Sequence, residues 1–391
     1  MIRGDKSSPE LEQELVLEAV SLDRSKDERI CKILEGTLDW KLLLSIATQQ
    51  GIFPLCCQRI MASAEKQIPP EEIKRWKELL KVNTQKNLRL TWKLINCVEL
   101  LANNGIECVV LKGPIYAIQA YAALGLRQYT DLDILIHRID FPKAYDLLEK
   151  SGYVPAFKLD KKLKEFEIRT DNHFLFYHQG DVFEVHCEIG QREINYPLRA
   201  ELMWQDLSVV HIFDKDVYSL SVENTITYAC LHGAMHSWNQ LKWIVDLAYL
   251  CQSISEISWP TLMDHARCKG LFRQVCLGLL LAEALVDVEL PLLVHNQIKT
   301  DRFAQVLASR VKTNLFTISN EPPLIADLKF YLRTRERWQD RLKLLLDVIF
   351  IPKQRDWLTV SLPENLFFLY YVFRPLRLLY RLGKLVFTIL F

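Results

Sequence analysis

The stretch ECVVLKGPIYAIQAYAALGLRQYTDLDILIH, residues 107–137, decides the fold. It contains an apolar run that ends at Lys112-Gly113-Pro114, a helix-like segment, and a second apolar run over 131–136. In a strand, successive side chains alternate between faces, so Asp131 and Asp133 point the same way, about 7 Å apart, while the apolar residues face a core. The pattern therefore predicts two carboxylates held on one face of a sheet.

Two carboxylates placed so close together repel one another and are costly to bury unless a cation lies between them. Oxygen ligands without Cys or His favour Mg²⁺ or Mn²⁺. A glycine turn after the preceding strand lets backbone N–H groups approach a phosphate, and the helix N-terminus that follows attracts it. The stretch thus predicts a metal site beside a phosphate site.

Strand, glycine turn, helix and Asp-x-Asp on the next strand resemble the nucleotidyltransferase superfamily that includes polymerase beta. More narrowly, the chain resembles the bacterial group of uncharacterised nucleotidyltransferase family proteins, from about residue 36 to the C-terminus. The residues that carry the resemblance are Leu111-Lys112-Gly113, Tyr121, Arg127, Asp131-x-Asp133-Ile-Leu-Ile, Gly152-Tyr153, Glu184-Val-His186, and the stretch from His232 to Leu250 with Asp246-Leu247.

This resemblance implies transfer of a nucleoside monophosphate from an NTP to an acceptor, with Mg²⁺ or Mn²⁺ as cofactor. Asp131, Asp133 and Glu184 are then the catalytic and metal-binding residues, and Glu184 supplies the third carboxylate that acts on the attacking hydroxyl. The nucleotide-binding residues are Lys112, Gly113 and Arg127. One departure is that Pro114 follows Gly113, where the superfamily has Gly-Ser or Gly-Gly, and proline offers neither a hydroxyl nor an N–H to the triphosphate.

Other interpretations of these residues remain open. His186 or Glu188 shares a strand face with Glu184 and is an alternative acid or base. Lys112 is either a phosphate ligand or a surface lysine, and Arg127 either holds phosphate or forms a salt bridge with an Asp at a strand end. His232 and His236 lie four residues apart. They are either cleft-lining histidines or a zinc pair, and the second interpretation agrees less well with the known zinc-binding motifs.

The predicted fold class is α+β, a small mixed-sheet nucleotidyltransferase core with flanking helical domains. We expect a helical region over 1–103, the core over 104–218, a helical domain over 219–320 and further helices over 321–391. The expected N-terminal helices cover 11–22, 27–34, 40–49, 53–64 and 70–103. Strands are expected over 107–112, 131–137, 173–177 and 182–189, with helices over 114–124, 140–151 and 221–250, broken near Trp238, and a linker around Asp214.

Composition restricts the partners. The 391 residues carry a net charge of +1, which argues against an extended nucleic-acid surface. The ten cysteines have no regular spacing, which indicates free thiols in a reducing cytoplasm. There is no apolar leader and no run of about 18 uncharged apolar residues, so neither a secretory signal nor a spanning helix is expected.

The residue pattern of the C-terminal segment 366–391 predicts a basic amphipathic helix. Arg374, Arg377, Arg381 and Lys384 fall within about 80° on a helical wheel, and apolar residues fill the rest. Such a helix lies either in a membrane interface or on the protein's own core, with its basic stripe in solvent. Three functions therefore remain open: an enzyme with an unknown small-molecule or protein acceptor, a catalytically silent nucleotide- or metal-binding scaffold, and a membrane-surface accessory protein.

Overall fold

The computed structural model describes residues 10–157, 161–190, 200–317 and 323–390. Its N-terminal helices are α1 (Glu10–Val20), α2 (Asp27–Leu34), α3 (Trp40–Gln49), α4 (Phe53–Ala64) and α5 (Pro70–Ala102). These bounds confirm the helices expected from apolar spacing, and three of the helices begin at a local signal. Asp39 caps α3 by accepting from the Lys41 and Leu42 N–H groups, and prolines lie in the first turns of α4 and α5.

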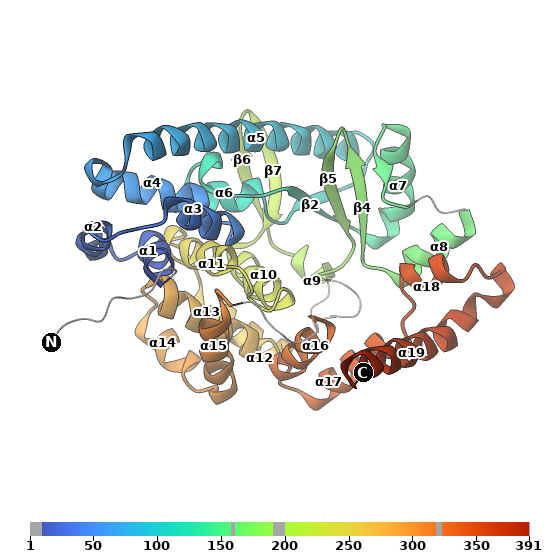
Figure 1. Cartoon of the computed structure of the whole chain (residues 1–391). Helices are drawn as coiled ribbons and strands as arrows, with labels where there is room; N and C mark the ends of the chain where they lie inside the picture. The colour runs from blue at the N-terminus through green and yellow to red at the C-terminus, as the bar shows by residue number, and fades with distance from the viewer. Residues whose placement is uncertain (1–9, 158–160, 191–199, 318–322, 391) are drawn as a thin grey trace.

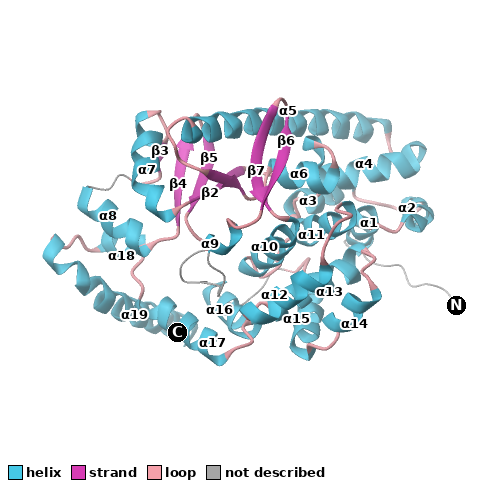
Figure 2. Cartoon of the chain, turned by 180° about the vertical axis from the view of Figure 1, so that it is seen from behind, coloured by secondary structure: helices cyan, strands magenta, loops and turns pink. Residues whose placement is uncertain are grey.

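One seven-stranded mixed sheet forms the centre of the molecule, with strand order β3-β4-β5-β2-β1-β7-β6. The strands are β1 (Cys108–Val110), β2 (Asp131–Ile136), β3 (Val154–Pro155), β4 (His173–His178), β5 (Asp181–His186), β6 (Leu207–Ile212) and β7 (Lys215–Leu220). The pairs β2/β5 and β1/β7 are parallel, and the other neighbouring strands are antiparallel. A mixed sheet within helical layers confirms the predicted α+β class (Figures 1 and 2).

Short helices connect these strands. They are α6 (Pro114–Tyr121), α7 (Phe141–Lys150), α8 (Lys161–Thr170) and α9 (Ala200–Met203). Helix α6 ends three residues earlier than predicted, because Ala122 adopts a left-handed conformation with a φ of 53°. The linker predicted around Asp214 is wrong: residues 207–220 form the β6–β7 hairpin, which extends the sheet beyond β1.

Helix α5 spans the molecule along the sheet, above the strands in Figure 1. Its inner face buries Leu90, Leu94 and Leu101. Arg89 on α5 donates two hydrogen bonds, of 2.6 and 2.8 Å, to the Asp181 carboxylate at the start of β5, and Lys93 donates one of 2.6 Å. This arrangement fixes the β4–β5 hairpin, which confirms the hairpin predicted from the turn at 178–181.

The remaining helices lie below the strands in Figure 1. They are α10 (Val222–Met235), α11 (Leu241–Ser253), α12 (Trp259–Lys269), α13 (Phe272–Val286), α14 (Leu292–Ile298), α15 (Arg302–Asn314), α16 (Pro323–Thr334), α17 (Trp338–Phe350), α18 (Gln354–Thr359) and α19 (Tyr370–Leu390). Ser221 caps α10 as predicted, accepting from the Asn224 N–H, and Trp238 lies in the break between α10 and α11. No described helix is long and apolar enough to cross a membrane.

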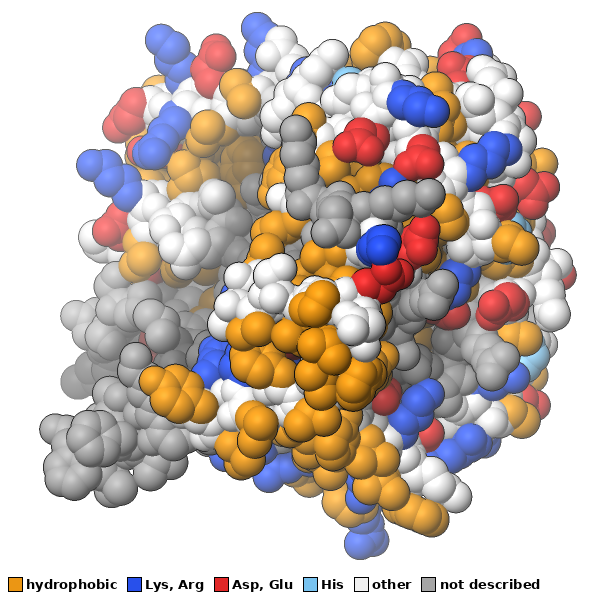
Figure 3. Space-filling view, turned by 90° about the vertical axis from the view of Figure 1, so that its right-hand side faces the viewer, with side chains coloured by type: hydrophobic (Ala, Val, Ile, Leu, Met, Phe, Trp, Pro, Cys, Tyr) orange, Lys and Arg blue, Asp and Glu red, His pale blue; other side chains and the backbone are white. Residues whose placement is uncertain are grey.

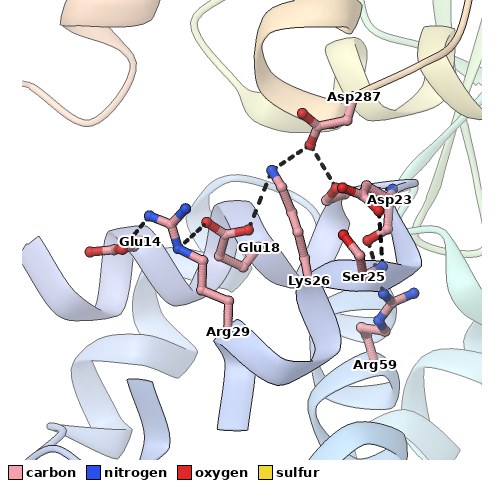
Figure 4. Close-up of polar contacts among 9 residues, drawn as sticks. Glu14, Glu18, Asp23, Ser25, Lys26, Arg29, Arg59 and Asp287 are labelled. Atoms are coloured by element: carbon pink, nitrogen blue, oxygen red, sulfur yellow. Dashed lines mark hydrogen bonds and ion pairs between the residues drawn. The ribbon is translucent and has the colours of Figure 1, made fainter. Parts of the chain in front are cut away.

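The N-terminal helices are tied to the end of α13. Asp287, in a left-handed conformation with a φ of 56°, accepts from Ser21 Oγ and Lys26 Nζ at 2.6 Å each. Arg29 on α2 pairs with Glu14 and Glu18 on α1, so the ion pairs form one continuous network (Figure 4). Segments more than 250 positions apart in the chain are thereby joined.

Candidate active site

The register of β2 and β5 brings the carboxylates together. Asp133 lies directly opposite Glu184 on the neighbouring parallel strand, and Asp131 is two residues earlier on β2. Leu132 and Ile134 face the opposite side and are fully buried, as strand alternation requires. Glu184 therefore lies on the same side of the sheet as the Asp pair, which confirms the placement predicted for neighbouring strands.

Lys112, in the turn after β1, lies between the two aspartates. Its Nζ is 2.9 Å from Asp133 Oδ1 and 3.2 Å from Asp131 Oδ2, and the side chain is buried. Burial alone would raise the pKa of Asp131, but the charge and hydrogen bond of Lys112 hold this pKa well below its usual range. Burial opposes the charge of Lys112 as well, yet Asp133 and Asp131 raise the pKa of the ammonium.

His186, at the end of β5, supplies a second cation. Its Nε2 is 3.2 Å from Asp133 Oδ1 and 3.5 Å from Glu184 Oε2. Burial alone would lower the pKa of His186, but the bonds to Asp133 and Glu184 raise it to about 9. His186 also holds the pKa of Glu184 below its usual range against the opposing effect of burial. In this arrangement His186 is protonated at neutral pH and acts as a hydrogen-bond donor.

The donor atoms fit a divalent cation. Asp133 and Glu184 each offer one carboxylate oxygen, and His186 offers a ring nitrogen once that nitrogen has lost its proton; these three atoms lie within 4.8 Å of one another. Asp133 Oδ2 is buried without a hydrogen-bond partner, as expected of an oxygen that is available to a metal. Asp131 is outside this group of three and joins it through Lys112. Carboxylate oxygens suit Mg²⁺ and Mn²⁺, whereas the imidazole is a donor more usual for other transition metals.

These groups open into a hollow of about 320 Å³, which we call the catalytic hollow. Its lining residues come from the sheet, from α10 and from α16, and they are Lys112, Asp131, His173, Glu184, His186, Gly190, Tyr228, His232, Met235, His236, Asn239, Asp327 and Tyr331. The structure thus brings together most of the residues singled out in the sequence, while Asp133, Gly113 and Arg127 are not among the lining residues, and the Asp133 side chain is 1% exposed.

Several lining residues were not predicted from the sequence. His173 pairs in register with His186 across the β4–β5 hairpin, and the two rings stack with centroids 5.7 Å apart. Tyr228 lies one turn before His232 on α10. The hairpin register could have predicted the position of His173, and the helical period that of Tyr228. Asp327 and Tyr331 gave no local signal, because α16 reaches the site only through the folding of the whole chain.

Gly113 makes the turn between β1 and α6 possible. Its φ of 63° and ψ of −117° lie in a region that residues with a Cβ rarely adopt. The nearest atom to an added Cβ is 3.8 Å away, so backbone conformation rather than space requires glycine here. The turn presents Lys112 to the aspartates, and Pro114 occupies the first position of α6.

Arg127 is engaged elsewhere in the structure. Its guanidinium donates to both oxygens of Asp246 on α11, with Nε–Oδ1 at 2.9 Å and Nη2–Oδ2 at 2.8 Å. Tyr121 donates to the same carboxylate at 2.8 Å. All three are residues that carried the family resemblance, and together they fix α11 against the segment that leads into β2. A phosphate-binding role for Arg127 remains a prediction.

His232 and His236 lie at the end of α10, with ring centroids 4.7 Å apart. Burial lowers the pKa of His232 well below its ordinary value, and nearby cations lower it further. His236 stacks on Trp243 at 4.5 Å, and burial, reinforced by Lys112 and Lys242, lowers its pKa to about 4. Within the described residues, neither histidine belongs to a group of three potential metal ligands.

A second hollow of about 670 Å³, here the adjoining hollow, shares Asn239 and Asp327 with the catalytic hollow. Side-chain amides line much of it: Gln13, Gln49, Gln50, Asn239, Gln240 and Asn314. It is formed by α1, α3, the α10–α11 connection, α15 and α16. A small molecule placed there would adjoin the carboxylate cluster.

Comparisons with known proteins bear on this site. The chain is similar to the solution structure of the antibiotic-resistance factor ANT(2'')-Ia, with a TM-score of 0.28 and 11% identity, covering 59% of this chain and 94% of that one. The comparison with curated proteins found no match. The model of a family described as uncharacterised nucleotidyltransferase matches residues 36–287, which contain the whole carboxylate cluster and more than half of the chain. The chain therefore belongs to this uncharacterised nucleotidyltransferase family.

Proposed function

We propose that the protein transfers a nucleoside monophosphate from an NTP to an acceptor hydroxyl and releases pyrophosphate. The observation that carries this proposal is the placement of Asp133 opposite Glu184, with Asp131 and Lys112 beside them, next to a hollow of about 320 Å³ that Lys112, Asp131 and Glu184 line. Three carboxylates so close together are costly without cations, and the divalent ions that accompany an NTP would add positive charge to that of Lys112 and His186.

Asp131, Asp133 and Glu184 would hold Mg²⁺ or Mn²⁺, which supplies charge neutralisation for the phosphates of an in-line displacement. Lys112 places a point charge beside those phosphates, and the Gly113 turn lets the backbone approach them. Glu184 orients the acceptor hydroxyl and takes its proton as the new O–P bond forms at the α-phosphorus and the bond to the β-phosphate oxygen breaks. Protonated His186 holds Asp133 and Glu184 in place through its hydrogen bonds.

The acceptor enters through the adjoining hollow in this proposal. Amides both donate and accept hydrogen bonds, so the five besides Gln50, whose amide bonds the Leu315 carbonyl and the Leu241 N–H, suit a small molecule with several hydroxyl groups. A volume of about 670 Å³ lies within the usual range for small-molecule sites, about 300 to 1,000 Å³. These features favour a small polyhydroxylated acceptor over a protein side chain.

The test is to incubate the purified chain with each α-labelled NTP, a metabolite extract, and Mg²⁺, Mn²⁺ or EDTA. We expect metal-dependent pyrophosphate release and label in the small-molecule fraction. Asp133→Asn should reduce the rate by about 10² or more, because it removes a charge at the reacting phosphate. Asp264→Asn on α12 is the matched control, since its side chain is 73% exposed and far along the chain from the cluster.

Different outcomes separate the alternatives. Label in protein instead of metabolites would contradict the small-molecule acceptor but keep the transferase. Nucleotide-dependent thermal stabilisation without transfer of label would overturn the enzyme and leave a silent nucleotide-binding protein. Equal transfer rates in Asp133→Asn and Asp264→Asn would overturn the site, provided both variants melt cooperatively.

A further inference from the structure

The C-terminal helices expose an unusual number of apolar side chains. On α17, Trp338, Leu342 and Leu346 recur every four residues and are 66%, 47% and 46% exposed. On α19, Val372, Leu376 and Leu379 are 56%, 59% and 65% exposed. We call these six residues the C-terminal apolar surface. In Figure 3 hydrophobic side chains gather in one patch on the side of the molecule where these helices lie.

Two of the basic residues of α19, Arg374 and Arg377, face the protein instead of the solvent. Arg374 is only 4% exposed, and it donates to Asp356 Oδ2 at 3.4 Å and to the Val348 carbonyl at 3.2 Å. Arg377 Nε lies 2.6 Å from Asp356 Oδ1, and Asp356 is fully buried. The sequence left open a helix docked on its own core with a basic stripe in solvent. At Arg374 and Arg377 the structure has the reverse arrangement.

This orientation is fixed by buried contacts. Asp356 also accepts from the Lys353 backbone N–H at 2.7 Å, so its carboxylate caps α18 while it pairs with both arginines. Tyr370, 1% exposed, donates to the Val360 carbonyl at 2.9 Å. Rotating α19 to bury its leucines would leave the buried Asp356 carboxylate without either arginine, which is costly. The apolar surface is therefore held outward.

The net charge of this region indicates what covers the C-terminal apolar surface. Residues 323–391 contain twelve Lys and Arg against six Asp and Glu, a net charge of +6, whereas the whole chain carries only +1. Arg355 and Arg381 are among the exposed cations of this region. A second copy of the same surface would bring two strongly positive regions together, which disfavours self-association. An anionic lipid surface complements both the apolar side chains and the positive charge.

We propose that the C-terminal apolar surface lies in the interface of an anionic membrane. The apolar side chains of α17 and α19 insert at the boundary between head groups and acyl chains, and exposed cations of the region, among them Arg355 and Arg381, contact the acidic head groups. Binding of this kind does not depend on nucleotide transfer, so the proposal stands or fails independently of the proposed function.

The test is co-sedimentation of the full chain with vesicles of phosphatidylcholine containing about a third phosphatidylglycerol, beside vesicles of phosphatidylcholine alone. We expect at least about tenfold more protein bound to the anionic vesicles, and weaker binding in high salt. Leu342→Glu/Leu376→Glu should abolish this binding. The matched control is Leu292→Glu/Val306→Glu, which places the same charges at positions that are 75% and 68% exposed on α14 and α15.

Both double variants change exposed residues, and thermal melting checks that they fold. Failure of the wild type to sediment with anionic vesicles would overturn the proposal, as would equal binding by the two double variants. A wild-type dimer in light scattering that Leu342→Glu/Leu376→Glu converts to monomer would show that a second copy covers the surface, and would also overturn it.

Discussion

At the residue scale, Lys112 lies between two carboxylates and supplies the positive charge that a metal ion would otherwise supply. It is buried and pairs with both Asp131 and Asp133. Lys112→Met should therefore leave Asp131 without its cation and Asp133 with His186 alone, and should lower the free energy of unfolding by about 3 to 5 kcal/mol in EDTA. Mg²⁺ or Mn²⁺ should restore much of this loss. Thermal melting with and without the ion measures both effects.

The comparison with wild type decides this prediction. A larger metal-induced rise in melting temperature for Lys112→Met than for wild type is expected, because the ion then replaces a missing charge. Lys299→Met, on the exposed end of α14, is the matched control and should melt as wild type does. An equal response of all three proteins to the metal would contradict the proposed role of the carboxylates.

His232 gives the stability of the protein a pH dependence. Because burial lowers its folded pKa well below 6.5, the unfolded chain binds a proton below this pH when the folded chain does not. Stability should therefore be fully present above about pH 7 and fall as pH decreases through 6.5, by about 1.4 kcal/mol per unit. His186 has the opposite sign: its contribution is present below 6.5 and is lost as pH rises through about 9.

Urea unfolding of His232→Asn between pH 7.5 and 5.5 isolates the contribution of His232. The variant should lose less stability over this interval than wild type. His211→Asn, at an imidazole that is 65% exposed, should keep the wild-type slope. If His232→Asn kept that slope too, His232 would be titrating normally in the folded protein.

At the element scale, the buried pair of Arg127 and Asp246 joins the segment before β2 to α11. Both side chains are at least 93% buried, so removing one partner leaves a charge without compensation. Arg127→Met and Asp246→Leu should each cost about 3 to 5 kcal/mol, and the double variant should cost much less than their sum. Urea unfolding of the wild type, the two single variants and the double variant gives the coupling free energy of the pair.

The exposed pair Arg267 and Asp264 on α12 is the control cycle. Its side chains are 41% and 73% exposed, so its coupling should be at most about 0.5 kcal/mol. Additive effects of Arg127→Met and Asp246→Leu would mean that each side chain acts through other neighbours.

Much of the fold and of the carboxylate cluster was predictable because the signals are local. The bounds of α2, α3 and α4 follow from apolar spacing and from caps such as Asp39, and strand alternation alone aligned Asp131 with Asp133. The Arg127 pairing was not predictable in this way, since its partner is 119 positions away. The β6–β7 hairpin was missed because its acidic turn resembled a linker, while its outer face carries exposed residues.

At the scale of the whole molecule, both hollows depend on α16 lying against the end of α10. Ser237 Oγ donates to Asp327 Oδ1 at 2.9 Å, and Tyr331 donates to the Met235 carbonyl at 2.6 Å. Asp327 lines both hollows, and Tyr331 lines the catalytic one. Helix α16, which leads on to α17 and α19, thus forms a wall of the candidate site.

Loss of one of these bonds should loosen α16 without unfolding the sheet. A hydrogen bond to a charged group contributes about 1.5 to 3 kcal/mol, so Ser237→Ala should raise amide hydrogen exchange in α16 by roughly 10- to 100-fold if α16 opens locally. Exchange in β2 and β5 should stay at wild-type rates, because these strands are buried in the sheet. Ser258→Ala, at the exposed start of α12, should change neither region. Unchanged exchange in α16 of Ser237→Ala would show that packing alone holds this wall of the site in place.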